Sequence, residues 1–235
     1  MNTRMNTHMK TWVKVARYNL ARPANYLLLP WVLPFSFAVG AVTAGRSPGH
    51  DAAGYLLTFF IYFAVQGMQS IGSSLPFGLT LGASRRSFYC GTALLGMALA
   101  VVSGLVLTVL QAIERATGGW GLSMDFFRVP YLLDGPWYAT WLTSAVVLFA
   151  LFVYGMWYGI VHSRWGVLGT VAFIAAQALV VVAVSVVVTF EHWHLWSAAD
   201  GSFAGLTALG LTGVIAALAV LLIAGGHATI RRVTV

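Results

Sequence analysis

Six side chains that form hydrogen bonds lie along one face of an otherwise apolar segment between residues 55 and 75. At 100° per residue, five of them fall within an arc of about 80°, and the sixth lies beside them. The set is Thr58, Tyr62, Gln66, Gln69 and Ser73, with Ser70 adjacent. Neutral amides and hydroxyls exchange hydrogen bonds but bring no formal charge. The pattern therefore predicts recognition rather than bond-breaking chemistry.

Two interpretations of this polar face stay open. Polar side chains inside a membrane avoid lipid, so the face either lines a substrate pathway or forms hydrogen bonds between helices. Such interhelical bonds contribute about 0.6 kcal/mol each on average, and they occur within a bundle or between two subunits. Gln177 is a further, isolated candidate for the same role.

No arrangement of residues typical of an enzyme or a metal site occurs in the sequence. Cys90 is the one cysteine, which excludes an intrachain disulfide and any metal site built on several cysteines. Neither G-x-x-x-x-G-K-[ST] nor H-E-x-x-H is present. His192 and His194 fit an aromatic cluster at the membrane interface better than a metal site. We therefore predict no catalytic residue, metal or cofactor in this chain.

The composition requires that helices inside a membrane position the polar face. Of 235 residues, 59% are hydrophobic and 8% are charged, whereas a soluble domain carries about 25% charged residues. This excludes an ordinary soluble enzyme, a disordered chain and a fibrous chain. The apolar runs predict an all-α polytopic membrane protein, with one transmembrane domain over residues 1–235. Its six expected spans are residues 25–44, 55–75, 88–113, 137–161, 167–190 and 204–224.

The charges predict how these spans are oriented. Six spans place both termini on one side, and ten of the 13 Lys and Arg residues fall on that side, with none of the six acids. Basic residues concentrate on the cytoplasmic side of membrane proteins, so we expect both termini in the cytoplasm. The net charge of +7 then reflects topology, and we predict no nucleic-acid partner.

A basic amphipathic helix is predicted over residues 9–22, ahead of the first span. Its polar stripe consists of Lys10, Lys14 and Arg17, spaced at i, i+4 and i+7. One interpretation is a simple anchor on the anionic lipid surface. The other is a connecting helix that a cytoplasmic partner contacts.

The external loop, residues 114–136, is rich in aromatic residues, which prefer the membrane interface. A role for this loop as a lid or gate stays open.

In the last span, small residues predict close helix packing. These are Gly210, Gly213 and Ala217.

The loop at residues 76–87 is the most informative cytoplasmic segment. Ser84 is a suitable N-cap for the third span, because its hydroxyl accepts a hydrogen bond from an unpaired backbone amide. Arg85 and Arg86 either contact headgroup phosphates or form a docking surface, and the apolar residues 79–83 favour docking.

Residues 81–89, Leu-Gly-Ala-Ser-Arg-Arg-Ser-Phe-Tyr, resemble the loop after the second span of bacterial ABC type-2 (type V exporter) permeases. The plan of the chain is also similar: a basic amphipathic helix, six spans, and no nucleotide-binding domain. One departure is that the longer external loop lies at 114–136, whereas that family places its larger external elements between spans five and six. The resemblance implies a coupling loop, assisted by Lys10, Lys14 and Arg17, that is centred on Thr80, Leu81, Gly82, Ala83, Ser84, Arg85 and Arg86.

The resemblance also implies partners and a location. Two copies of a separate ABC ATPase chain would bind ATP and Mg²⁺, and a second permease copy or a homologous permease would complete the pathway in the bacterial cytoplasmic membrane. The chain would then be a permease subunit of an exporter and not itself an enzyme. Alternatives are a stand-alone carrier or channel, and a membrane scaffold or sensor. Hydrophobic drugs, lipids, glycolipids and peptides are all compatible substrates.

Overall fold

The computed structural model describes residues 28–32, 35–36, 39, 52–72, 84–118, 127, 136–190 and 208–230. Within these residues the chain is helical almost throughout, and none of them forms a strand. The four main helices are α3 (Ala52–Gly72), α5 (Arg85–Ala116), α6 (Trp137–Phe190) and α8 (Ala208–Ile230). The predicted all-α class is confirmed over this part of the chain.

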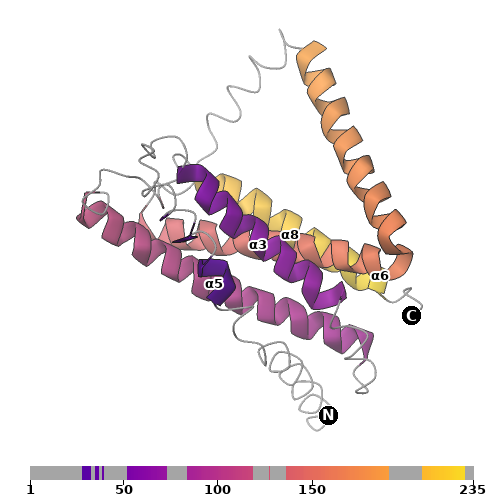
Figure 1. Ribbon diagram of the computed structural model, residues 1–235, viewed down its shortest axis with the longest axis horizontal. Helices are drawn as coiled ribbons and strands as arrows, with labels where there is room; N and C mark the ends of the chain where they lie inside the picture. Colours follow the sequence, from indigo (N-terminus) through magenta and orange to yellow (C-terminus); the bar gives the residue numbers. More distant parts are fainter. Residues whose placement is uncertain are drawn as a thin grey trace.

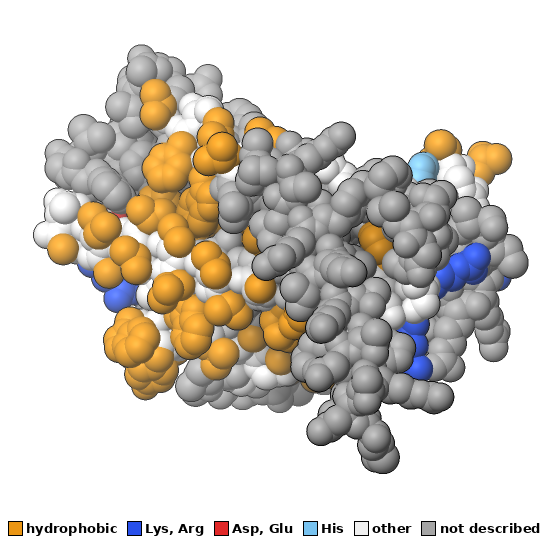
Figure 2. All heavy atoms as spheres, turned by 90° about the horizontal axis from the view of Figure 1, so that it is seen from below, with side chains coloured by type: hydrophobic (Ala, Val, Ile, Leu, Met, Phe, Trp, Pro, Cys, Tyr) orange, Lys and Arg blue, Asp and Glu red, His pale blue; other side chains and the backbone are white. Residues whose placement is uncertain are grey.

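Three helical segments among the described residues are long and apolar enough to cross a membrane: Arg85–Ala116, Trp137–Ala183 and Gly210–His227. On the face drawn in Figure 2, hydrophobic side chains cover much of the described surface, and basic side chains lie toward its two ends. Apolar surface of this extent suits lipid rather than water. The chain is therefore described as a helical membrane protein, while the count of six spans and the side of the termini stay predictions.

Helix α6 is central, and Gly166 divides it into two parts. Gly166 has φ 64° and ψ −155°, a combination that essentially only glycine adopts. The first part, residues 137–165, packs with α3, α5 and α8, whereas the second part, residues 167–190, turns back and diverges from them (Figure 1). The break falls in the turn predicted between the spans 137–161 and 167–190.

The helices alternate in direction. Helices α3 and α8 run the same way as the first part of α6, and α5 runs the opposite way (Figure 1). The end of α3, the start of α5, the Gly166 turn and the end of α8 therefore lie together at what we call the elbow end. Arg85, Arg86 and Arg164 belong to this end, and Arg115 belongs to the other.

Glycines bring the backbones of α3 and α6 into direct contact. A Cβ atom on Gly67 would overlap the carbonyl oxygen of Phe152, and one on Gly155 would overlap the carbonyl oxygen of Ala64. A Cβ on Gly159 would lie 2.7 Å from another carbonyl oxygen of α3. The spacing of Gly155 and Gly159 is the small-x-x-x-small pattern of closely packed membrane helices. No side chain fits at these positions without separating the two helices.

The packing positions predicted in the last span are wrong in part. A Cβ on Gly213 would meet nothing within 4 Å, and both Gly213 and Ala217 are exposed. Helix α8 instead packs through Thr212 and Ala219, which are buried. Small-residue spacing shows where a close approach is possible, but it does not show which face meets a neighbouring helix.

Hydrogen bonds fasten α8 to both α5 and α6. They join Trp157 Nε1 to the carbonyl of Leu222 (2.9 Å), the Tyr89 hydroxyl to the carbonyl of Ile223 (3.3 Å), and the hydroxyls of Thr143 and Thr212 to each other (2.7 Å). Gly226 is buried and lies against Tyr89, so that a Cβ atom at this position would overlap the tyrosine hydroxyl. The elbow end of α8 is thus attached to both α5 and α6.

Candidate functional site

The predicted polar face of α3 divides into inward and outward side chains. Gln66 and Ser70 are buried, Thr58 and Tyr62 are half-buried, and Gln69 is exposed. The Ser70 hydroxyl donates to the carbonyl oxygen of Gln66 at 2.8 Å, which satisfies it within its own helix. Ser73, the last member of the predicted set, lies outside the described residues. Gln66 therefore lies in the interior of the bundle, whereas Gln69 lies on its surface.

The other helices contribute buried polar side chains that were not predicted. One signal was present in the sequence, because positions 140, 143 and 144 share a helix face at i, i+3 and i+4 spacing. The buried neutral set from α5, α6 and α8 consists of Ser87, Thr92, Ser103, Thr108, Gln111, Thr140, Thr143, Ser144 and Thr212, and the carboxylate of Glu114 on α5 is buried as well. The bundle interior is therefore a mixture of apolar and mostly neutral polar groups.

Substitution of the two glutamines of α3 by leucine is expected to have different effects. Gln66→Leu should lower the free energy of unfolding by about 0.6 kcal/mol, the average for a polar contact between membrane helices. Gln69→Leu should lower stability less, since the side chain is exposed. Equilibrium unfolding in mixed micelles measures the loss in each variant. Equal losses of stability would contradict the division of the face.

Gln177, the isolated candidate, belongs to a cluster that spans the turn of α6. Its Oε1 atom accepts hydrogen bonds from the hydroxyls of Tyr154, at 2.8 Å, and of Tyr158. The two hydroxyls are 3.1 Å apart, and the ring of Tyr158 packs edge-on against Phe173 with centroids 5.1 Å apart. Neither tyrosine was predicted. Their i, i+4 spacing would have indicated them, together with the similar distances of Tyr154 and Gln177 from Gly166, which are 12 and 11 residues.

This Tyr–Gln cluster is neutral and half-buried. Hydrogen bonds hold one amide and two hydroxyls close together in this cluster. A polar group of a passing molecule can therefore replace one of these hydrogen bonds. One turn nearer the elbow, His162 Nδ1 lies 3.2 Å from the hydroxyl of Thr170. The two parts of α6 therefore open apart from the elbow (Figure 1), and side chains of the two parts meet as far from the turn as Gln177.

The basic start of α5 forms the second candidate site. Ser84 is the N-cap, and its Oγ accepts a hydrogen bond from the Ser87 amide at 3.2 Å, so the predicted cap is confirmed. Arg85 is half-buried and Arg86 is exposed. Residues 85–87 belong to the helix and not, as predicted, to the loop 76–87. The first turn became helical because the Ser84 cap satisfies one of its free amides.

Helix stability does not account for these two arginines. The N-terminus of a helix carries a partial positive charge, so basic residues there are unfavourable. Their position indicates an interaction outside the helix. Lys10, Lys14, Arg17 and residues 80–83, which were predicted to join them, lie outside the described residues.

At the other end of the bundle, Glu114 ties the external loop to α5. It is 3% exposed, and its Oε2 atom accepts a hydrogen bond from the backbone amide of Phe127 at 2.9 Å. A buried carboxylate of this kind needs such partners. The contact fixes one point of the predicted external loop 114–136, most of which lies outside the described residues.

No protein-family model, curated protein or solved structure matches this chain. In the part of the chain that the structure describes, no group of three or more His, Cys, Asp or Glu side chains is placed to hold a metal ion. What these residues offer is neutral hydrogen bonding within the helices and basic groups at the elbow end.

Proposed function

We propose that this chain is the membrane-spanning permease subunit of an ATP-driven ABC exporter in the bacterial cytoplasmic membrane. A second copy, or a homologous permease, completes the translocation pathway. Two separate ATPase chains bind ATP and Mg²⁺ and dock at the loop 76–87 and the helix 9–22. In this proposal both termini lie in the cytoplasm, on the same side as the elbow end.

The observation that supports this proposal best is the capped, basic first turn of α5. Arg85 and Arg86 follow the Ser84 cap directly, at a position where helix electrostatics disfavour positive charge. These residues belong to the Gly-Ala-Ser-Arg-Arg stretch, whose residue pattern resembles that of the coupling loop of type-2 permeases. A surface at the end of a helix bundle suits a motor subunit, because displacement there acts along the helices.

The polar side chains support a substrate that is uncharged or amphiphilic. Gln69 is exposed on α3, and the Tyr–Gln cluster is neutral and half-buried. Among the described residues between Arg86 and Glu114, and between Trp137 and His162, no Asp, Glu, Lys or Arg occurs. A substrate with a fixed charge would find no counter-charge along these segments, so proton or sodium coupling of the usual kind is disfavoured.

Reversal of the charge at the start of α5 tests the proposal. The double variant Arg85→Glu, Arg86→Glu is expected to lose the ATPase chains on co-purification, because like charges placed across an interface repel. ATP-dependent flux in proteoliposomes should then fall by about ten-fold or more. The matched control is Arg115→Glu at the opposite end of α5, which should keep both the partner and the flux.

Three results would contradict the proposal. The first is purification of the wild-type chain without any ATPase subunit, and the second is full flux by the charge-reversed variant. The third is transport by the purified chain alone in vesicles without ATP, which would instead indicate a carrier or channel driven by a gradient.

A further inference from the structure

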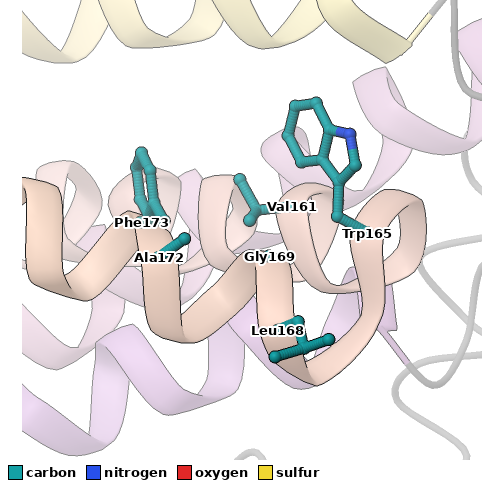
Figure 3. Close-up of a pocket in the computed structure, with 6 residues that line it drawn as sticks. All are labelled: Val161, Trp165, Leu168, Gly169, Ala172 and Phe173. Carbon is teal, nitrogen blue, oxygen red and sulfur yellow. The ribbon is translucent and has the colours of Figure 1, made fainter.

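An apolar crevice opens at the elbow of α6, between its two parts (Figure 3). Its volume is about 550 Å³, within the range of about 300–1,000 Å³ that is usual for ligand sites. Trp165 and Phe173 project to the same side of the elbow, with Val161 between them (Figure 3). The lining residues are Val161, Trp165, Leu168, Gly169, Ala172 and Phe173. None of the six carries a charge, so the crevice suits a hydrocarbon chain.

Two glycines create the crevice. Gly166 reverses the chain direction with its positive φ of 64°, and Gly169 leaves room for Trp165, because a Cβ there would overlap the Cβ of that tryptophan. At one end of the lining, Phe173 packs on Tyr158. The crevice is therefore a consequence of the turn itself and is shaped by residues on both of its arms.

A positive charge stands at the mouth of this crevice. The guanidinium carbon of Arg164 lies 4.7 Å from the ring centroid of Trp165, within the range of a cation–π contact. Arg164 is the only Asp, Glu, Lys or Arg residue between positions 137 and 190. Tryptophan prefers the headgroup level of a membrane, and Arg85 and Arg86 lie at the same end of the bundle. These features indicate that the end of the crevice at Arg164 and Trp165 lies at the membrane surface and that the rest of its lining lies in the hydrocarbon.

We propose that the crevice binds one anionic phospholipid of the surrounding membrane. One acyl chain lies against Val161, Ala172 and Phe173, and the phosphate pairs with Arg164. The apolar lining excludes a charged solute, and the adjacent arginine favours a negative headgroup over a zwitterionic one. The site is separate from the coupling surface at Arg85 and Arg86, so it does not depend on the proposed export function.

Native mass spectrometry of the purified full chain tests this site. The chain is titrated with an equimolar mixture of phosphatidylglycerol and phosphatidylcholine in detergent, and the retained lipids are counted. Wild-type protein should retain one phosphatidylglycerol with a preference of about five-fold, the effect of one basic residue at an anionic lipid surface. Arg164→Gln should abolish the preference, and Arg164→Lys should keep most of it. Arg115→Gln, at the opposite end, is the control and should change nothing.

A second pair of variants tests the crevice itself. Ala172→Trp fills the crevice and should reduce retention of both lipids, whereas Ile174→Trp, on another face of the same helix, should not. The proposal is overturned if Arg164→Gln keeps the preference, if Arg115→Gln loses it equally, or if Ala172→Trp has no effect. It is also overturned if Ala172→Cys, in a Cys90→Ala background, forms a disulfide-linked dimer with no retained lipid, because a second copy would then cover the crevice.

Discussion

Gly155→Ala is expected to lower the free energy of unfolding by about 3 kcal/mol, at the upper end of the usual range for overpacking. The added methyl group would overlap the carbonyl oxygen of Ala64, and it would lie 3.0 Å from the Cα of the same residue. A flexible side chain moves aside, but these atoms belong to the backbone of α3, so the two helices must separate. Equilibrium unfolding in mixed micelles, followed by circular dichroism, measures the loss.

The matched control is the same change at Gly213 of α8. A Cβ there would meet nothing within 4 Å, so Gly213→Ala should not lower the free energy of unfolding and should raise it by up to about 1 kcal/mol, the helix preference of alanine over glycine. The two variants differ only in what surrounds the added methyl group. If both lose the same stability, the loss arises from glycine chemistry in general, and the close contact between α3 and α6 is wrong.

Gly166→Val is expected to prevent the chain from reaching its folded arrangement. The φ of 64° and ψ of −155° at this position are costly for any residue with a Cβ, by about 1–3 kcal/mol. The unstrained alternative is a continuous helix of 54 residues, about 80 Å long, which far exceeds the hydrocarbon thickness of about 30 Å. The yield of monodisperse membrane protein should therefore fall severely.

Gly118 provides the comparison for this variant. It also has a positive φ, 62°, and lies in the turn that follows α5. Gly118→Val should bring backbone strain of the same order but leave the direction of α6 unchanged, so most of the protein should still be recovered in folded form. Equal loss of folded protein in the two variants would contradict a special role for the α6 elbow.

The sequence was sufficient to locate α5 and the break in α6, because lipid requires long apolar segments that are easy to recognise. The expected span 88–113 lies inside α5, and the interruption Ser163-Arg164-Trp165-Gly166 coincides with the break in α6. The Ser84 cap was predictable for a local reason, since its hydroxyl and the amide that it satisfies are three residues apart. The predicted last span ends at residue 224, whereas α8 continues to Ile230, because polar residues do not mark the end of that apolar run clearly.

The contacts between helices were much less predictable. Gly155 and Gly213 look alike in a sequence, yet one touches a backbone and the other faces open space. The difference depends on which helices become neighbours, and that is decided by long-range packing. For the same reason Gln177 was recognised as a candidate without Tyr154 and Tyr158, which are distant in sequence and contact it only across the turn.

Tyr89, in the second turn of α5, joins this helix to the C-terminal part of α8. It lies four residues after Arg85, and its hydroxyl donates to the carbonyl of Ile223 at 3.3 Å while resting against Gly226. The first turn of α5 therefore cannot slide along the last turns of α8 without breaking this hydrogen bond and displacing the ring. Tyr89 lies about 6 Å along α5 from Arg85, so a displacement of the first turn of α5 acts on α8 through this hydrogen bond.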